Sequence, residues 1–283
     1  MTSPSYETIL VNEDDGVVTV TFNRPEKMNS YTWRLGAETR HAIWTADQRD
    51  DVRAVVVTGA GRAFCAGADL SGGATTFSGG GADAAAENRR EVLAALRTPD
   101  TSYWDMNTPI IAAINGAAVG VGLTMPMQWD IRIAAEDAKL GFVFNRRGII
   151  PELAAPWIVP RVVGLSRGFE LLVTGKIISG REAAEWGLVS KALPKDEVLP
   201  AALEMAHDIA INVAPVSAAL MKRMIYMDQM ETDMARAQDR NHQLFGWTAT
   251  KPDAKEGPMS FLEKRKPEWQ LKKNADFPEE LLK

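Results

Sequence analysis

Hydrophobic positions in the first sixty residues alternate between runs typical of strands and a spacing typical of a helix. β-branched residues fill 8–11 and 17–22 on either side of an acidic turn that ends in Gly16, and this pattern predicts a hairpin. Apolar side chains recur at helical spacing over 31–50, and 54–59 is an apolar run that fits a strand buried on both faces. The chain therefore begins as a mixed α/β protein.

Strand and helix patterns go on alternating up to residue 153, after which helical patterns dominate. We expect a helix over 87–104, a strand over 109–114, a short helix ending at Met127, and strands over 130–135 and 139–142 that continue the sheet. Residues 195–230 predict two helices divided near Pro215. Residues 71–83 are mostly Gly, Ser, Thr and Ala with little to bury, so they predict either a mobile loop or partly ordered lid, or a plain disordered insertion.

Composition narrows the class of protein. With 283 residues, 46% of them hydrophobic, the chain can bury a large core. A net charge of -5 argues against nucleic acid as the main partner. The first residues lack a basic start followed by an apolar run, and no apolar stretch approaches about 18 residues, so we expect no membrane segment. The single cysteine, Cys65, excludes an internal disulfide and suits a cytoplasmic protein.

Two glycine-rich stretches, 63–70 and 114–122, each follow a predicted strand. Small residues at such turns leave backbone N–H groups uncovered, and two converging donors could hold an oxyanion. No Gly-Lys-Ser/Thr follows either stretch, and the second lacks the third glycine of a dinucleotide fingerprint, so phosphate or NAD binding is only a minor alternative. Turns that simply link strands to helices are the default reading for either stretch alone.

Five motifs give the chain a family resemblance over nearly its whole length. In order and spacing they resemble the crotonase (enoyl-CoA hydratase/isomerase) superfamily: 23–29 (NRPEKMN), 63–70 (AFCAGADL), 114–122 (INGAAVGVG), 183–189 (AAEWGLV) and 261–267 (FLEKRKP). The resemblance implies an α/β spiral of β-β-α units over 1–195 and a C-terminal helical trimerisation region over 196–283. It also implies acyl-CoA substrates, a homotrimer or dimer of trimers, and no cofactor or metal apart from the coenzyme A of the substrate.

The resemblance assigns the two oxyanion donors to the backbone N–H groups of Ala68 and Val121. Preorganised donors of this kind stabilise the transition state by roughly 2.7 to 4 kcal/mol each. Most relatives have an unbroken run of glycines at the second position. Val121 is β-branched, so its backbone must keep a negative φ or accept strain.

The acid–base residues depart from the hydratase pattern. Hydratases of this family use two glutamates, and their positions fall on Thr124 and Phe144, neither of which moves a proton at neutral pH. Glu152 instead matches the catalytic glutamate of one branch of Δ3,Δ2-enoyl-CoA isomerases, and the nucleophilic aspartate of the related aroyl-CoA dehalogenases. An apolar setting of Ile150, Leu153 and Trp157 would raise its pKa. Pro151-Glu152 is also an ordinary helix start.

Three functions stay open. An isomerase needs only Glu152, which takes a proton from C2 of a 3-enoyl thioester and returns it at C4. A hydratase or carbon–carbon hydrolase would activate water through Glu152 or through a residue that the sequence does not identify. A non-catalytic acyl-CoA binder would keep the fold after losing its carboxylates.

The remaining predicted contacts are with the substrate. Resemblance places the CoA moiety on Lys27, Met28 and the backbone from Ala66 to Leu70, with Asp69 orienting that loop. Phe261 and Lys264 match residues that reach the nucleotide from a neighbouring subunit, although Lys264 is equally a solubilising charge. We expect the acyl group to meet the loop after Leu70, a helix end near Tyr103 and Trp104, and the strand end from Phe142 to Phe144, although aromatic residues at helical spacing are more often plain core. The predicted substrate-binding residues also include Gly120 and Trp157. Arg146 and Arg147 could meet a polar acyl group, or form a solvated face.

Overall fold

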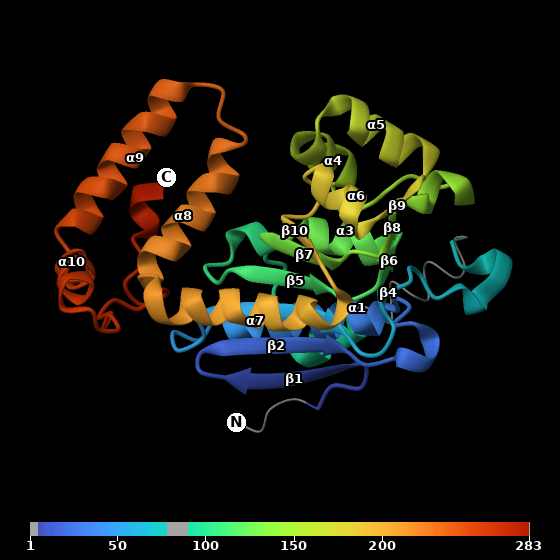
Figure 1. Cartoon of the computed structure of the whole chain (residues 1–283), viewed down its shortest axis with the longest axis horizontal. Coiled ribbons are helices and arrows are strands. Elements are labelled where there is room, and N and C mark those ends of the chain that lie inside the picture. The colour runs from blue at the N-terminus through green and yellow to red at the C-terminus, as the bar shows by residue number, and fades with distance from the viewer. Residues whose placement is uncertain (1–4, 78–89, 283) are drawn as a thin grey trace.

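The computed structural model describes residues 5–77 and 90–282, with only the backbone of 74 and 75. Two β-sheets form its centre (Figure 1). The larger sheet has six strands in the order β1 (Ile9–Asp14), β2 (Val17–Phe22), β3 (Ala54–Gly59), β5 (Ile110–Ile114), β7 (Ile131–Ala135) and β10 (Lys191–Leu193). The smaller has four, in the order β4 (Ala63–Cys65), β6 (Ala117–Val119), β8 (Lys139–Gly141) and β9 (Ile177–Ser179).

The first half of the large sheet confirms the predicted hairpin and central strand. β1 and β2 pair antiparallel with Ile9 opposite Phe22, and β2 pairs parallel with β3. All six residues of β3 are buried. A strand covered on both faces needs apolar side chains at every position, as the sequence pattern indicated.

Successive strand pairs divide between the two sheets, and this division produces the predicted β-β-α spiral. In each of the pairs β3/β4, β5/β6 and β7/β8, the first strand joins the large sheet and the second joins the small one. The expectation that 139–142 continues the same sheet is therefore wrong. A tight turn, in which Ala138 N–H donates to the Ala135 carbonyl at 3.0 Å, redirects the chain into the second sheet.

Helices cover part of the two sheets. Their bounds are α1 (Trp33–Asp47), α3 (Val121–Met127), α4 (Ala155–Val163), α5 (Leu165–Thr174), α6 (Gly180–Glu185), α7 (Lys195–Asn212), α8 (Pro215–Asp228), α9 (Met234–Ala249) and α10 (Asp253–Glu263). None of the helices in the described part of the chain is long and apolar enough to cross a membrane. The division near Pro215 is confirmed, because α7 ends at Asn212 and α8 starts at Pro215.

The helix expected over 87–104 is shorter than predicted. Residues 90–96 are helical, 87–89 lie outside the described residues, and Tyr103–Asp105 forms a separate 3₁₀ turn. Arg97 has a φ of 53°, which ends the helix. Thr98 precedes Pro99, and a residue before proline is disfavoured in helical conformation.

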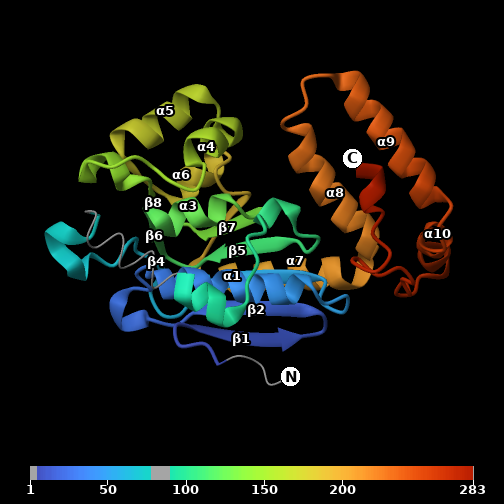
Figure 2. The same ribbon diagram turned by 180° about the vertical axis from the view of Figure 1, so that it is seen from behind.

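The C-terminal third contains two kinds of helix. The two opposite views place α7 and α1 on opposite faces of the large sheet (Figures 1 and 2), and Val198, Ala202 and Ala206 of α7 are fully buried in the main core. The predicted boundary at 195/196 falls at the start of α7. From α8 onward the chain projects from one side of the sheets and has its own small apolar cluster, built on Val216, Leu220, Met224, Leu244 and Leu282.

Candidate active site

An open cleft of about 590 Å³ lies where the loop after β4, the start of α3 and the segment after β8 meet. This size is typical of a small-molecule site. Most of its lining is apolar side chains or bare backbone, with three charged side chains, Asp69, Arg147 and Glu152. Of the predicted residues it contains Ala66, Ala68, Asp69, Leu70, Gly120, Val121, Phe144 and Glu152.

The first predicted donor, Ala68, forms an isolated parallel β-bridge with Tyr31, and this pairing turns the Ala68 N–H away from Tyr31. Tyr31 N–H donates to the Gly67 carbonyl at 2.7 Å, and Asp69 N–H donates to the Tyr31 carbonyl at 2.9 Å. In a parallel ladder such bonds flank a residue whose own N–H points to the opposite side. The Ala68 N–H therefore faces away from Tyr31, and Ala68 lines the cleft.

The second predicted donor, Val121, is the first residue of α3. Amides of a first helical turn have no acceptor within the helix. The positive φ that the turn requires, 57°, falls on Gly120, while Val121 itself has helical backbone. The β-branched residue is thus accommodated without the strain that its position could have caused. A Cβ on Gly67 would lie 3.0 Å from the Val119 carbonyl oxygen, so the loop that carries Ala68 and the turn before Val121 are in direct contact.

Glu152 reaches the cleft from the segment before α4. Thr124 Oγ1 donates a hydrogen bond of 2.6 Å to Glu152 Oε1. α4 begins at Ala155 with no side-chain cap. The Glu152 carboxylate therefore contacts α3 instead of capping α4.

Burial of the Glu152 carboxyl raises its pKa, and the Thr124 hydrogen bond opposes that rise by favouring the charged form. The side chain as a whole counts as exposed because the cleft is open. Protein atoms around the carboxyl group nevertheless remove part of the water that would stabilise its charge. A carboxylate with a raised pKa is suited to accept and return a proton near neutral pH.

The backbone after Glu152 adopts an unusual conformation. Leu153 and Ala154, with φ of 55° and 57°, are consecutive left-handed residues that are not glycine. Such conformations cost on the order of 1–3 kcal/mol each and persist only where the surroundings support them. Support comes from Gln128 at the end of α3, whose side-chain amide donates to the Leu153 carbonyl at 3.4 Å.

Asp69 anchors the loop over 66–70, which carries Ala68 and is the first donor loop. Its carboxylate accepts from Arg24 Nη2 at 3.0 Å and from the Ser71 backbone N–H at 3.1 Å. The hydrogen bond from Arg24 lowers the pKa of Asp69 to about 2. Asp69 is therefore ionised and engaged within its loop, which leaves Glu152 as the cleft carboxylate suited to proton transfer.

The loop after Leu70 borders the cleft as expected. Leu70–Thr75 form 3₁₀ turns interrupted by a kink at Gly73, and Phe77 is a lining residue; positions 78–83 of the predicted lid lie outside the described residues. Tyr103, expected beside the acyl group, is instead buried in the core with its ring edge-on to Trp129 at 6.2 Å between centroids. The helix predicted to carry Tyr103 toward the cleft ends before it.

Several predicted contact residues lie outside the lining of the cleft. Trp157 stacks on the guanidinium of Arg161, 3.8 Å from its ring centroid. Met28 lies behind the donor loop, where its carbonyl accepts from Ala66 N–H at 3.1 Å, and Lys27 is exposed. Phe261 is 82% exposed on α10, and Lys264 ends that helix; both lie on the projecting C-terminal helices.

The two arginines after Phe144 have different environments. Arg146 donates through Nε to the Thr174 carbonyl at 2.8 Å and so belongs to the contact with α5. Arg147 lines the cleft and donates through Nη1 to the Arg146 carbonyl at 3.2 Å. Arg147 is therefore the one of the pair placed to meet a ligand.

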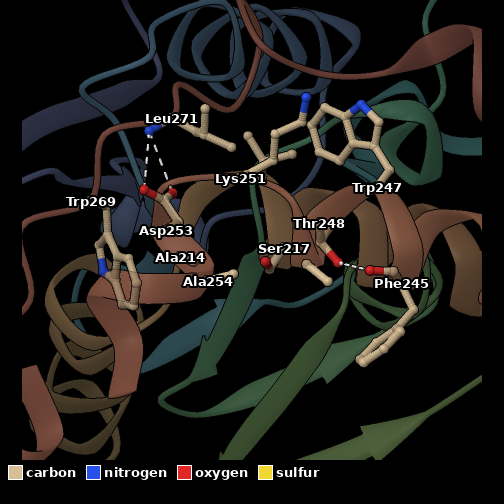
Figure 3. Close-up of a pocket in the computed structure, with 12 residues that line it drawn as sticks. Ala214, Ser217, Phe245, Trp247, Thr248, Lys251, Asp253, Ala254, Trp269 and Leu271 are labelled. Carbon is tan, nitrogen blue, oxygen red and sulfur yellow. Dashed lines mark hydrogen bonds between the residues drawn. The ribbon is translucent and has the colours of Figure 1, made fainter. Parts of the chain in front are cut away.

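A second hollow, of about 450 Å³, lies among the C-terminal helices (Figure 3). Trp247 lies under Lys251, whose Nζ is 4.2 Å from the ring centroid. Asp253 accepts from the Gln270 backbone N–H at 2.8 Å and contacts that of Leu271. None of the predicted site residues lines this hollow, and its carboxylate is engaged with backbone.

The contact between Thr124 and Glu152 could not be predicted from the sequence, in which Thr124 marks only a missing carboxylate. Nothing local in the sequence indicates a contact with a residue 28 positions away. Over residues 5–77 and 90–282, no group of three or more His, Cys, Asp or Glu side chains is arranged to hold a metal ion.

Comparison with known proteins agrees with this architecture. The family model described as enoyl-CoA hydratase/isomerase matches residues 12–272. The chain is 32% identical to the 1,2-epoxyphenylacetyl-CoA isomerase of Escherichia coli, over 93% of this chain and 98% of that protein. It is 34% identical to the enoyl-CoA hydratase ACTT3 of Alternaria alternata, over 90% and 83% respectively.

Solved structures show the same similarity. A probable enoyl-CoA hydratase/isomerase from Mycobacterium abscessus superposes with a TM-score of 0.83 at 37% identity, covering 93% of this chain and 98% of that one. An enoyl-CoA hydratase from Bacillus anthracis gives 0.80 at 33% identity, covering 93% and 99%. The chain belongs to the enoyl-CoA hydratase/isomerase (crotonase) family, and its C-terminal helices are part of the shared fold.

Proposed function

We propose that the protein is an enoyl-CoA isomerase that moves a double bond with a single glutamate. The observation that supports this most is the pairing of Glu152 with Thr124 at 2.6 Å, in a cleft that also contains the amides of Ala68 and Val121. Thr124 and Phe144 occupy the two positions at which the hydratases that this chain resembles have glutamates. This cleft therefore offers one proton-transfer group instead of two.

The reaction follows from these three groups. Glu152 takes a proton from C2 of a 3-enoyl-CoA, and the C–H electron pair delocalises into the thioester to give a dienolate. The amides of Ala68 and Val121 donate to the oxygen on which negative charge develops, and the dipole of α3 adds to this stabilisation. Glu152 then returns the proton at C4, leaving the double bond between C2 and C3 and the carboxylate regenerated.

Hydration is the second candidate, because relatives of similar identity bear the names of a hydratase and of an isomerase. In that reaction Glu152 would have to activate water and also protonate C2 without a second carboxylate. The lining of the cleft favours isomerisation, since its other carboxylate, Asp69, is already paired with Arg24.

The assembly and setting are part of the same proposal. A homotrimer or dimer of trimers would cover the apolar side chains that α8–α10 and the turn between α8 and α9 expose, among them Met221, Ile225, Met230, Met234, Phe245, Phe261 and Leu262. We propose a core over 1–195, onto which α7 packs, and an oligomerisation region over 196–283 whose projecting helices α8–α10 make the subunit contacts. In this arrangement Phe261 and Lys264 contact the nucleotide of a neighbouring subunit, and Lys27 and Met28 contact the CoA bound to their own subunit. The reaction uses no cofactor beyond the CoA of the substrate, and a cytoplasmic location fits the single thiol.

A panel of thioesters tests the proposal. The protein is incubated in deuterated water with 2-enoyl-, 3-enoyl- and cyclic acyl-CoA compounds, and the products are followed by mass. Conversion of 3-enoyl- to 2-enoyl-CoA with deuterium exchange and no gain of water is the expected result. Hydration of crotonyl-CoA at a rate equal to or above isomerisation would favour a hydratase, and tight binding without turnover of any thioester would indicate a binding protein.

A further inference from the structure

We propose that Thr124 is a positioning residue, which holds one oxygen of Glu152 and leaves the other to exchange the proton with the thioester. This inference rests on the proposed function, in which Glu152 is the base. It gives a role to a position that the family resemblance marks only as a missing carboxylate.

The hydrogen bond is well defined on both sides. Thr124 is fully buried, and its hydroxyl donates to Oε1 of Glu152 at 2.6 Å. A threonine within a helix commonly bonds back to the carbonyl four residues earlier. Here the Gly120 carbonyl already accepts from the backbone N–H groups of Leu123 and Thr124, and the hydroxyl instead points out to Glu152.

One short helix thereby links the oxyanion site to the base. Val121 and Thr124 are three residues apart on α3, so they lie on neighbouring positions of one face. Gln128, four residues after Thr124, holds the Leu153 carbonyl and with it the left-handed backbone beside Glu152. The position of the carboxylate relative to the Val121 amide is therefore set by contacts from a single rigid element.

The contact also affects proton transfer directly. A hydroxyl donor stabilises the ionised carboxylate and fixes its orientation, so proton exchange is directed to Oε2. Among the charged groups around the cleft, Asp69 is paired with Arg24, and Arg147 is the cation of the lining. α3 has no charged residue, and Arg161 of α4 stacks on Trp157.

Three variants test the proposal. Thr124→Val removes the hydroxyl at nearly constant volume, Thr124→Ala removes it without crowding, and Thr124→Ser retains it. The matched control is Thr39→Val: Thr39 is also fully buried in a helix, and its hydroxyl donates to the Leu35 carbonyl at 2.7 Å, away from the cleft. Each folded variant is titrated by carbon-13 NMR of labelled glutamate, with Glu152→Gln identifying the resonance, and assayed with 3-hexenoyl-CoA.

We expect the pKa of Glu152 to rise in Thr124→Val and Thr124→Ala and to stay near the wild-type value in Thr124→Ser. We expect kcat to fall roughly ten- to hundredfold without the hydroxyl, with KM changed by about twofold or less. The acid limb of the pH profile should move to higher pH. Thr39→Val should change stability alone.

An unchanged Glu152 pKa and unchanged kcat in whichever hydroxyl-free variant folds would overturn the inference. If Glu152→Gln instead turns over 3-hexenoyl-CoA like the wild type, the proposed function fails, while the NMR titration still decides whether Thr124 controls the carboxylate. The two failures are therefore distinguishable.

Discussion

Gly122 packs directly against the carbonyl oxygen of Cys65. A Cβ added to Gly122 would lie 2.1 Å from that oxygen, closer than any real contact. The first donor loop leaves the sheet directly after Cys65, and the second donor lies one residue before Gly122. This contact therefore fixes the separation of the two amides in the proposed oxyanion hole.

Gly122→Ala should push α3 away from β4. We expect a loss of about 1–3 kcal/mol in the free energy of unfolding, as for other overpacked cores, and a larger fractional loss of kcat than of substrate affinity. Gly246→Ala is the control, because nothing lies within 4 Å of the added Cβ in α9. The control should gain about 0.5–1 kcal/mol and keep its activity. Equal stability of the two variants in denaturant titrations would contradict the packing argument.

The ion pair between Asp69 and Arg24 should maintain the donor loop. Asp69→Asn is expected to lower kcat/KM, because the loop that presents the Ala68 amide loses its charged anchor. Asp100→Asn provides the comparison, since Asp100 makes a 3.0 Å contact with Arg40 but is fully exposed. Surface pairs of that kind contribute little, so its kinetics should match the wild type.

The ion pair between Asp69 and Arg24 should also make part of the free energy of unfolding sensitive to acid. The pKa of Asp69 is depressed to about 2, so its stabilising contribution is present above its unfolded value of about 4 and is lost as the pH falls from there through the folded value. Thermal unfolding of Asp69→Asn should lack this part of the pH dependence. A wild-type profile and a variant profile that run parallel below pH about 4 would be the contrary finding.

Cys65 should be inert in the folded protein. It is fully buried, and burial raises the pKa of its thiol to about 11. Thiolate-selective reagents react with the ionised form, so native protein at mildly alkaline pH should resist labelling and guanidinium-unfolded protein should take up one label. Gly122→Ala should be labelled faster than the wild type, because the variant disturbs the strand that contains this thiol. Rapid labelling of the native wild type would show that the strand is open.

The ionised carboxylate of Glu152, the proposed base, should lower the free energy of unfolding at neutral pH. Since the folded pKa of Glu152 is raised, its contribution is most favourable below its ordinary value and is lost as the pH rises through the folded one. Glu152→Gln is neutral at every pH and keeps an acceptor for Thr124. Its Tm should exceed that of the wild type at neutral pH, and the gap should close in acid. Glu185→Gln, at an exposed position on α6, should show no such gap.

The sequence predicted the elements that rest on local pattern. The hairpin, the buried β3 and the break between α7 and α8 follow from apolar spacing and proline, which act over a few residues. The helix predicted over 87–104 is too long, because its apolar spacing continues past Thr98, where the following Pro99 disfavours a helical backbone. β9 and β10 were missed because they are three-residue strands within a part of the chain where helical patterns dominate.

Some residues of the candidate site could be predicted from the sequence, and others could not. Ala68, Gly120 and Glu152 were identified from motifs, and the structure brings them to one cleft. Trp157 was expected beside Glu152, but it lies on α4 outside the lining of the cleft, where it stacks on Arg161, and two left-handed residues, Leu153 and Ala154, precede that helix. A reversal of backbone at two non-glycine residues has no clear signature in sequence, because it depends on tertiary support.

The central claim is that one carboxylate, Glu152, moves the proton, and turnover by Glu152→Gln tests it most directly. The variant and the wild type are compared with a 3-enoyl-CoA in deuterated water, with CoA-thioester affinity measured in parallel. We predict a loss of isomerisation and of C2 exchange by a factor of roughly 10² to 10⁴, with affinity unchanged. Exchange and isomerisation at the wild-type rate in Glu152→Gln would contradict the account.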